Sequence, residues 1–166
     1  ELKITNSIDT VTYNEEKRVE LISKRTKYSK TFLNLSGSKT LEVSLEPIHF
    51  KDEKDEWKEI NNEIVLKRQE DCYENIANSF KVKFPLKVKE NEPIVKFSFK
   101  DINISIIPLN IEDNIKVTKN QTSIIYKNIW NGVDLIYEIK NSKLKEYIIV
   151  NSLETTLSLN FQYQME

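Results

Sequence analysis

The chain has 166 residues, enough for one hydrophobic core, and its 25 Lys and Arg residues nearly balance its 26 Asp and Glu residues, leaving a net charge of -1. Because the two signs are well mixed, composition gives no electrostatic case for nucleic acid or an anionic membrane as a partner. No apolar run approaches the roughly 20 residues of a membrane-spanning helix, and the single cysteine, Cys72, excludes an internal disulfide and a cysteine-based zinc site.

The first part of the chain is polar and weakly patterned. Residues 1–24 predict an N-terminal arm, within which residues 15–23 could form one or two helical turns. The chain begins with Glu1 rather than Met, so we expect a piece or a mature segment of a longer polypeptide. Residues 31–35 and 40–45 then predict a hairpin that turns at Gly37. The residues expected to form its half-buried face are Leu41, Val43 and Leu45.

Short strand signals continue through the middle of the chain. Ile48-His49-Phe50 leads into an acidic turn, and Trp57 to Ile60 leads out of it. Residues 67–78 are polar, and we expect them to form a connection rather than a strand. Beyond it, apolar residues alternate with polar ones in three further predicted strands, as strands with one buried face require. These strands cover residues 80–86, 95–99 and 102–106, and a final strand covers 157–163.

Residues 126–150 carry the strongest pattern and predict two consecutive hairpins. Asn131-Gly132 tolerates the positive φ angles of a tight turn, and Asn141-Ser142 marks the second turn. The middle strand alternates cleanly, and its expected core face consists of Val133, Leu135, Tyr137 and Ile139. Many short strands without long amphipathic helices predict an all-β fold, an antiparallel β-sandwich or open barrel with little helix. We expect this domain to span residues 25–166, after the arm of residues 1–24.

Candidate sites for chemistry are few. His49 is the only histidine, and no serine lies in a nucleophile elbow, so a structural role for His49 is favoured over catalysis. The acidic turn of residues 52–56 offers oxygens for Ca²⁺, but interleaved lysines favour a solvated hairpin tip. Asp134 and Glu146 could form a glycosidase pair only if they faced one cleft. We therefore expect no enzyme, cofactor or metal site.

Aromatic residues offer a second kind of site, because sugar rings stack on exposed aromatic faces. Trp130 and Tyr126 share one side of a predicted strand, yet their aliphatic neighbours favour the core for Tyr126 and for Tyr137. Trp57 stands beside the acidic turn and is the ring expected to be exposed. Trp57 and His49 are thus the candidate ligand-binding residues.

Three blocks of sequence resemble a known family. They are residues 25–64 with PIHFKD, Trp57 and INN; residues 74–85, ENIANSFKVKFP; and residues 126–152 with GVDLIY and KEYII. In this order they resemble the N-terminal, non-repeat region of large secreted or wall-associated proteins of Gram-positive bacteria. Many of those proteins carry RHS/YD repeats, and some carry a DNRLRE-type carbohydrate-binding module. Here residues 53–56 replace a turn that usually contains glycine, and Asn131 replaces a frequent proline.

The resemblance implies an extracellular or cell-wall location and a β-rich module of a longer polypeptide, and it brings no catalytic residues. We therefore expect a non-enzymatic structural or assembly module of such a protein, RHS-type toxins included, whose partners are neighbouring domains of the same polypeptide. One alternative is a carbohydrate-binding module for cell-wall or extracellular glycans, which exposed aromatics around Trp57 would favour. The other is a wall-polymer hydrolase domain, which needs convergent carboxylates near His49.

Overall fold

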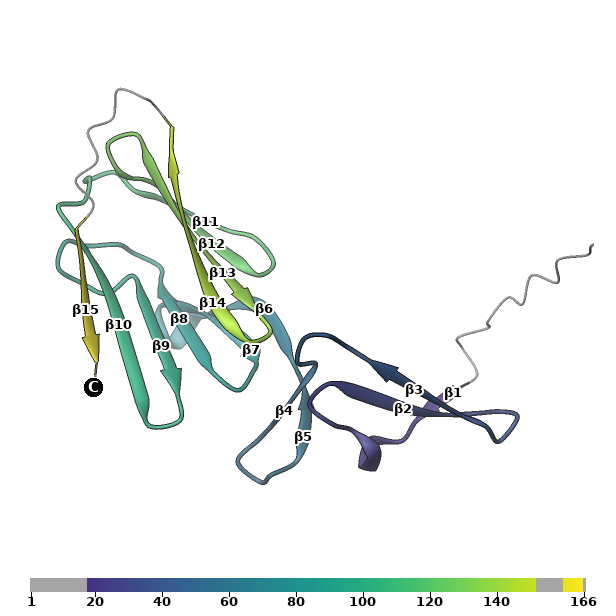
Figure 1. The fold of residues 1–166 in the computed structure, drawn as a ribbon. Helices are drawn as coiled ribbons and strands as arrows, with labels where there is room; N and C mark the ends of the chain where they lie inside the picture. The colour runs from purple at the N-terminus through teal and green to yellow at the C-terminus, as the bar shows by residue number, and fades with distance from the viewer. Residues whose placement is uncertain (1–17, 152–159, 166) are drawn as a thin grey trace, which may run out of the picture.

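The computed structural model describes residues 18–151 and 160–165, and these residues form antiparallel β-sheets with only two short 3-10 turns. The turns are η2 (Ile22–Lys24) and η3 (Arg68–Glu70). The expected all-β fold with little helix is confirmed. Figure 1 shows two lobes: a two-layered sandwich that contains the C-terminal strand, and a smaller N-terminal lobe. None of the described segments is a helix long and apolar enough to cross a membrane.

The sandwich consists of a six-stranded and a four-stranded sheet (Figure 1). The larger sheet has the order β15-β10-β9-β8-β7-β6. Its strands are β6 (Asn61–Lys67), β7 (Cys72–Ala77), β8 (Lys81–Pro85), β9 (Val95–Phe99), β10 (Ile102–Leu109) and β15 (Asn160–Met165). The smaller sheet has the order β11-β12-β13-β14. Its strands are β11 (Lys116–Lys119), β12 (Ser123–Trp130), β13 (Val133–Lys140) and β14 (Lys143–Val150).

The core lies between these two sheets and draws on both. Phe84 of β8 and Tyr137 of β13 face each other with ring centroids 6.2 Å apart. The hydroxyl of Tyr126 donates a 2.7 Å hydrogen bond to the carbonyl of Ile94, so this fully buried phenol has a partner. Tyr126 and Tyr137 therefore belong to the core, as expected.

The two hairpins predicted in residues 126–150 are confirmed. β13 pairs with β12 on one side and with β14 on the other, and Val133, Leu135, Tyr137 and Ile139 are all buried. Gly132 has a φ of 70° in the first turn, a left-handed conformation that glycine adopts without a steric cost. Between Tyr126 and Trp130 the register of β12 shifts at a bulge.

The N-terminal lobe contains a three-stranded sheet and a separate hairpin (Figure 1). The sheet consists of β1 (Arg18–Glu20), β2 (Ser29–Asn34) and β3 (Lys39–Val43), and the hairpin of β4 (His49–Lys51) and β5 (Trp57–Glu59). The hairpin predicted around Gly37 is thus confirmed. Residues 18–24, however, form β1 and η2 within this lobe and are not an extended arm. Residues 1–17 of the expected arm, and Leu157 and Leu159 of the expected final strand, lie outside the described residues.

Two expectations about individual strands are wrong. Residues 72–77 form β7, a central strand between β6 and β8, where a polar connection was expected. Polar side chains are buried there: the amide of Asn75 donates to the carbonyl of Phe80 and accepts from the N–H of Val82.

Leu41, Val43 and Leu45 were expected to be half-buried, and all three are exposed. The sheet β1–β3 has its apolar face on the outside of the lobe.

Candidate functional site

A cleft of about 520 Å³ separates the β4–β5 hairpin from the end of the sandwich that carries β9 and the β13–β14 turn. Both candidate ligand-binding residues, His49 and Trp57, line it. Its aromatic lining consists of Phe50, Trp57, Phe80, Phe97 and Phe99. Its basic and neutral polar lining consists of Lys27, Lys51, Lys100, Ser79, Asn141 and Ser142. No acidic residue is among the described residues that line this cleft.

Trp57 reaches the cleft because β5 pairs with β4, which places the indole opposite Lys51. The ring is half-buried rather than fully exposed, and the Lys51 ammonium lies 5.4 Å from its centroid. Across the cleft, Phe99 is partly exposed, and the Lys100 ammonium lies 5.5 Å from its ring centroid. The cleft therefore has an aromatic ring with an adjacent ammonium on each of its two walls.

His49 is fully buried beneath the cleft. Its Nδ1 lies 2.7 Å from the carbonyl oxygen of Thr26, so Nδ1 is the donor of this hydrogen bond. Nε2 has no hydrogen-bond partner among the described residues. The backbone N–H of His49 donates to the carbonyl of Lys27, so this residue also ties the hairpin to the N-terminal sheet.

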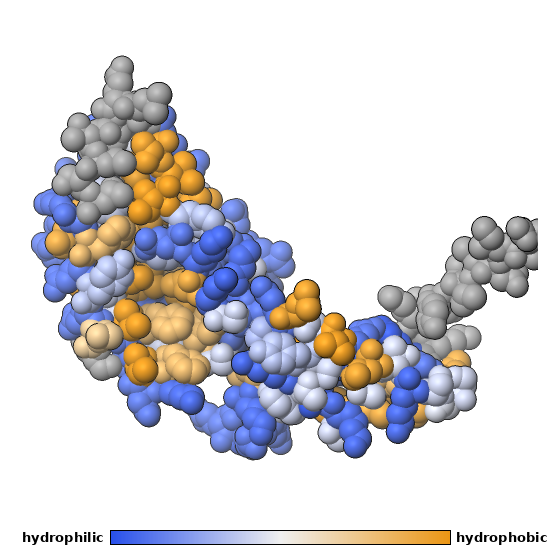
Figure 2. Space-filling model, viewed as in Figure 1, coloured by the Kyte–Doolittle hydropathy of each residue, from blue (hydrophilic) through white to orange (hydrophobic). Residues whose placement is uncertain are grey.

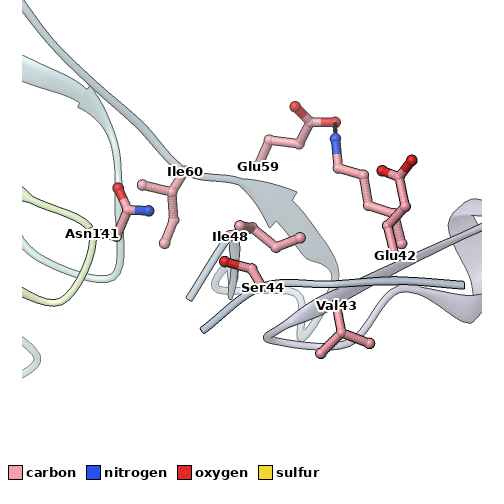
Figure 3. Close-up of a pocket in the computed structure, with 8 residues that line it drawn as sticks. Glu42, Val43, Ser44, Ile48, Glu59, Ile60 and Asn141 are labelled. Carbon is pink, nitrogen blue, oxygen red and sulfur yellow. Dashed lines mark hydrogen bonds and ion pairs between the residues drawn. The ribbon is translucent and has the colours of Figure 1, made fainter. Parts of the chain in front are cut away.

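An ion-pair cluster surrounds His49 where the hairpin contacts the N-terminal sheet. The Arg25 guanidinium donates to both carboxylate oxygens of Glu20 at 2.7 and 2.8 Å and to Glu59 at 2.8 Å. Lys30 donates to the same Glu59 oxygen at 2.8 Å, an ion pair drawn in Figure 3. These hydrogen bonds lower the pKa of Glu20, chiefly through Arg25, and that of Glu59, chiefly through Lys30.

Glu20, His49 and Glu59 offer ligand atoms within 4.8 Å of one another, which is the only such group among the described residues. A cation at this point would meet Arg25 and Lys30, which already neutralise the two carboxylates. The cluster is therefore explained as a structural ion-pair network. It borders a smaller pocket of about 400 Å³, in which Ser44, Ile48 and Ile60 approach Asn141 of the sandwich (Figure 3).

Asparagines join the two sheets of the sandwich next to these pockets. Asn62 donates to the side-chain oxygen of Asn141 at 2.8 Å. Asn78 donates to the side chain of Asn62 at 2.8 Å and to the backbone carbonyl of Asn141 at 3.2 Å. The turn predicted at Asn141-Ser142 thus contacts the start of β6, and sequence reasoning missed this network because each asparagine lies in a separate turn or strand end.

The remaining candidates are placed elsewhere. Asp52 accepts from the backbone N–H groups of Lys54 and Glu56, so its carboxylate holds the hairpin tip together. Asp134 and Glu146 do not face one cleft: Glu146 lies opposite Tyr137 in the register, and Asp134, three positions from Tyr137 along β13, projects to the other face. Glu146 accepts a 2.5 Å hydrogen bond from the Tyr137 hydroxyl. Trp130 is buried, and its Nε1 donates to the carbonyl of Leu109.

Comparison of the chain with protein-family models, with curated proteins and with solved structures finds no match.

Proposed function

We propose that this chain is a non-enzymatic structural module that assembles with neighbouring domains of its own polypeptide through the outer face of the sheet β1–β3. The observation that carries the proposal is the orientation of this sheet. Directly paired residues of antiparallel strands share a face, so the pairs Val19 with Leu33 and Thr31 with Leu41 place three aliphatic side chains and one threonine on the same face. Val43 continues this face two residues beyond Leu41. We call the surface of Val19, Leu33, Leu41 and Val43 the outer face.

The outer face is exposed to solvent, with 68% of Val19, 61% of Leu41 and 70% of Val43 accessible. Figure 2 shows apolar groups along the part of the N-terminal lobe where Figure 1 places β3. Leu35 and Leu45, in the turns beside this face, are more exposed still. Single exposed apolar side chains are ordinary on a protein surface, whereas a group of them on one face of a sheet indicates an interaction site.

The inner face of the same sheet is largely charged, and most of its residues are less exposed than those of the outer face. Arg18 pairs with Glu42 at 2.6 Å and lies over the ring of Phe32, while Glu20 and Lys30 enter the ion-pair cluster with the β4–β5 hairpin. A β-sheet is stable when its apolar face packs on another layer. In this lobe the less exposed face is the charged one, and the described residues place no layer over the apolar face.

We assign that layer to a neighbouring domain of the same polypeptide, with an apolar face of its own. The polypeptide preceding Arg18 joins this sheet directly at β1, so covalent linkage gives the adjoining chain a high effective concentration at the outer face. The edges of β1 and β3 are unpaired among the described strands and offer backbone groups to an added strand. The extracellular or cell-wall location is supported by the resemblance of the three sequence blocks alone.

The isolated 166-residue chain tests this proposal through binding of the dye ANS and sedimentation velocity. We expect a monomer that binds ANS, with most of that binding lost in the double variant Leu41→Lys, Val43→Lys. The matched control, Ile76→Lys with Ile102→Lys, removes two exposed aliphatic side chains from the sandwich and should retain ANS binding.

Two results would contradict the assignment. A discrete dimer that the double variant dissociates would assign the outer face to a second copy. A monomer that binds no ANS until residues 1–17 are deleted would show that the chain covers this face itself.

A further inference from the structure

We propose that the cleft between the β4–β5 hairpin and the sandwich binds a glycan whose sugar rings carry carboxylates, that is, a polyuronic acid. The inference is independent of the assembly proposed for the outer face, since the cleft opens between the lobes and shares none of the residues of that face.

The charge of the cleft selects an anion. Three lysines line it and no described acidic residue does, in a chain whose acidic and basic residues are nearly equal in number. Lys51 is partly neutralised by Asp55 at 2.6 Å. Lys27 and Lys100 contact aromatic rings, at 5.5 Å from the centroids of Tyr28 and Phe99, and have no carboxylate partner among the described residues. These two ammonium groups are therefore available to an anionic ligand.

The shape and apolar lining of the cleft select a ring. Its volume of about 520 Å³ lies in the range of small-molecule sites, which bury most of a ligand against apolar and aromatic side chains. Trp57 and Phe99 present rings from opposite walls, and Phe97 is anchored by stacking on Phe80 at 5.1 Å. A sugar ring offers an apolar C–H face to such rings, while Asn141 and Ser142 offer hydrogen bonds to its hydroxyls.

The position of the lysines favours a carboxylate on the ring itself. The ammonium groups of Lys51 and Lys100 lie 5.4 and 5.5 Å from the centroids of Trp57 and Phe99. Because each ammonium lies over the face of its aromatic ring, a sugar ring that approaches either side chain meets a positive charge beside it, with which the carboxylate of a uronic acid can pair. An acidic peptide has no equivalent ring face, and a neutral sugar leaves the lysines unpaired.

The test is calorimetric titration of the chain with a short oligogalacturonate and with its methyl ester, which keeps the rings but lacks the charge. We expect the acid to bind and the ester to bind on the order of tenfold more weakly, as loss of a charge-assisted contact implies. Lys27→Gln with Lys100→Gln should weaken binding of the acid by a similar factor. The matched control, Lys116→Gln with Lys127→Gln, removes two exposed lysines from paired positions of β11 and β12 and should bind as the unaltered chain does.

Trp57→Ala should abolish binding and Trp57→Phe should retain part of it, provided that both variants show the unaltered circular dichroism. The proposal is overturned by absence of binding at millimolar acid, by equal binding of acid and ester, or by equal binding of oligoglutamate. Equal weakening in the cleft and control lysine variants would also overturn it, because the attraction would then be to the whole charged surface rather than to the cleft.

Discussion

Val19 of β1 and Leu33 of β2 lie directly opposite each other in the register, and both are turned to solvent rather than to a core. Cross-strand apolar pairs of this kind normally stabilise a sheet by packing beneath a second layer. The described residues contain no second layer over the outer face. The proposed assembly role accounts for this exposed apolar surface.

The exposure of the outer face implies a contrast with the sandwich core. Leu41→Thr should change the free energy of unfolding of the isolated chain by less than about 0.5 kcal/mol, because the side chain is exposed. Leu135→Ala removes a fully buried side chain and should lower it by about 2–5 kcal/mol. Urea denaturation followed by circular dichroism measures both. Comparable losses in the two variants would show that Leu41 is buried in solution.

The ion pair of Glu20 with Arg25 implies a pH dependence. Because Arg25 lowers the pKa of Glu20 below its ordinary value of 4.5, the unfolded chain takes up this proton at a higher pH than the folded chain. The stabilisation is therefore present above pH 4.5 and lost as the pH falls through the folded pKa. Glu20→Gln should be less stable than the unaltered chain at neutral pH, and the difference should shrink below pH 4.5. A difference independent of pH would contradict the ion pair.

The hydroxyl of Tyr126 donates a hydrogen bond to the carbonyl oxygen of Ile94 inside the sandwich. Tyr126→Phe should lower the free energy of unfolding by about 1–3 kcal/mol, because a buried acceptor loses its donor. Tyr163→Phe, at a mostly exposed position of β15, is the control and should be near neutral. Thermal denaturation of both variants measures the difference, and equal effects would argue against burial of the Tyr126 hydroxyl.

Asn78 links both Asn62 and Asn141, so it should couple the two sheets at this end of the sandwich. We expect Asn78→Ala to accelerate hydrogen exchange at the β13–β14 turn and at the start of β6, with little change in the core of β13. Asn120→Ala, at an exposed turn position, should leave exchange at these sites unchanged. Uniform acceleration across the sandwich would indicate global destabilisation rather than loss of a local link.

The sequence predicts much of this fold because several strands with one face on the core preserve the period of two, as in β8, β9 and β13. It fails at β7, where Asn75 and Glu74 are buried polar residues and break the apolar pattern. It also misplaces Leu41 and Val43, because alternation shows that residues share a face but not whether a second layer covers it. The cleft brings His49 and Trp57 together with Phe99 and Lys100, and only the tertiary arrangement of hairpin and sandwich reveals this.

The most direct test of the assembly role is photo-cross-linking from position 41. The complete polypeptide, produced in its own cell with benzoylphenylalanine in place of Leu41, would be irradiated and its cross-linked peptides identified by mass spectrometry. A mixture of isotopically labelled and unlabelled protein distinguishes contacts within one polypeptide from contacts between copies. We expect cross-links to another domain of the same polypeptide, outside residues 1–166. Cross-links confined to residues 1–17 or to a second copy, or none at all, would contradict the proposed role.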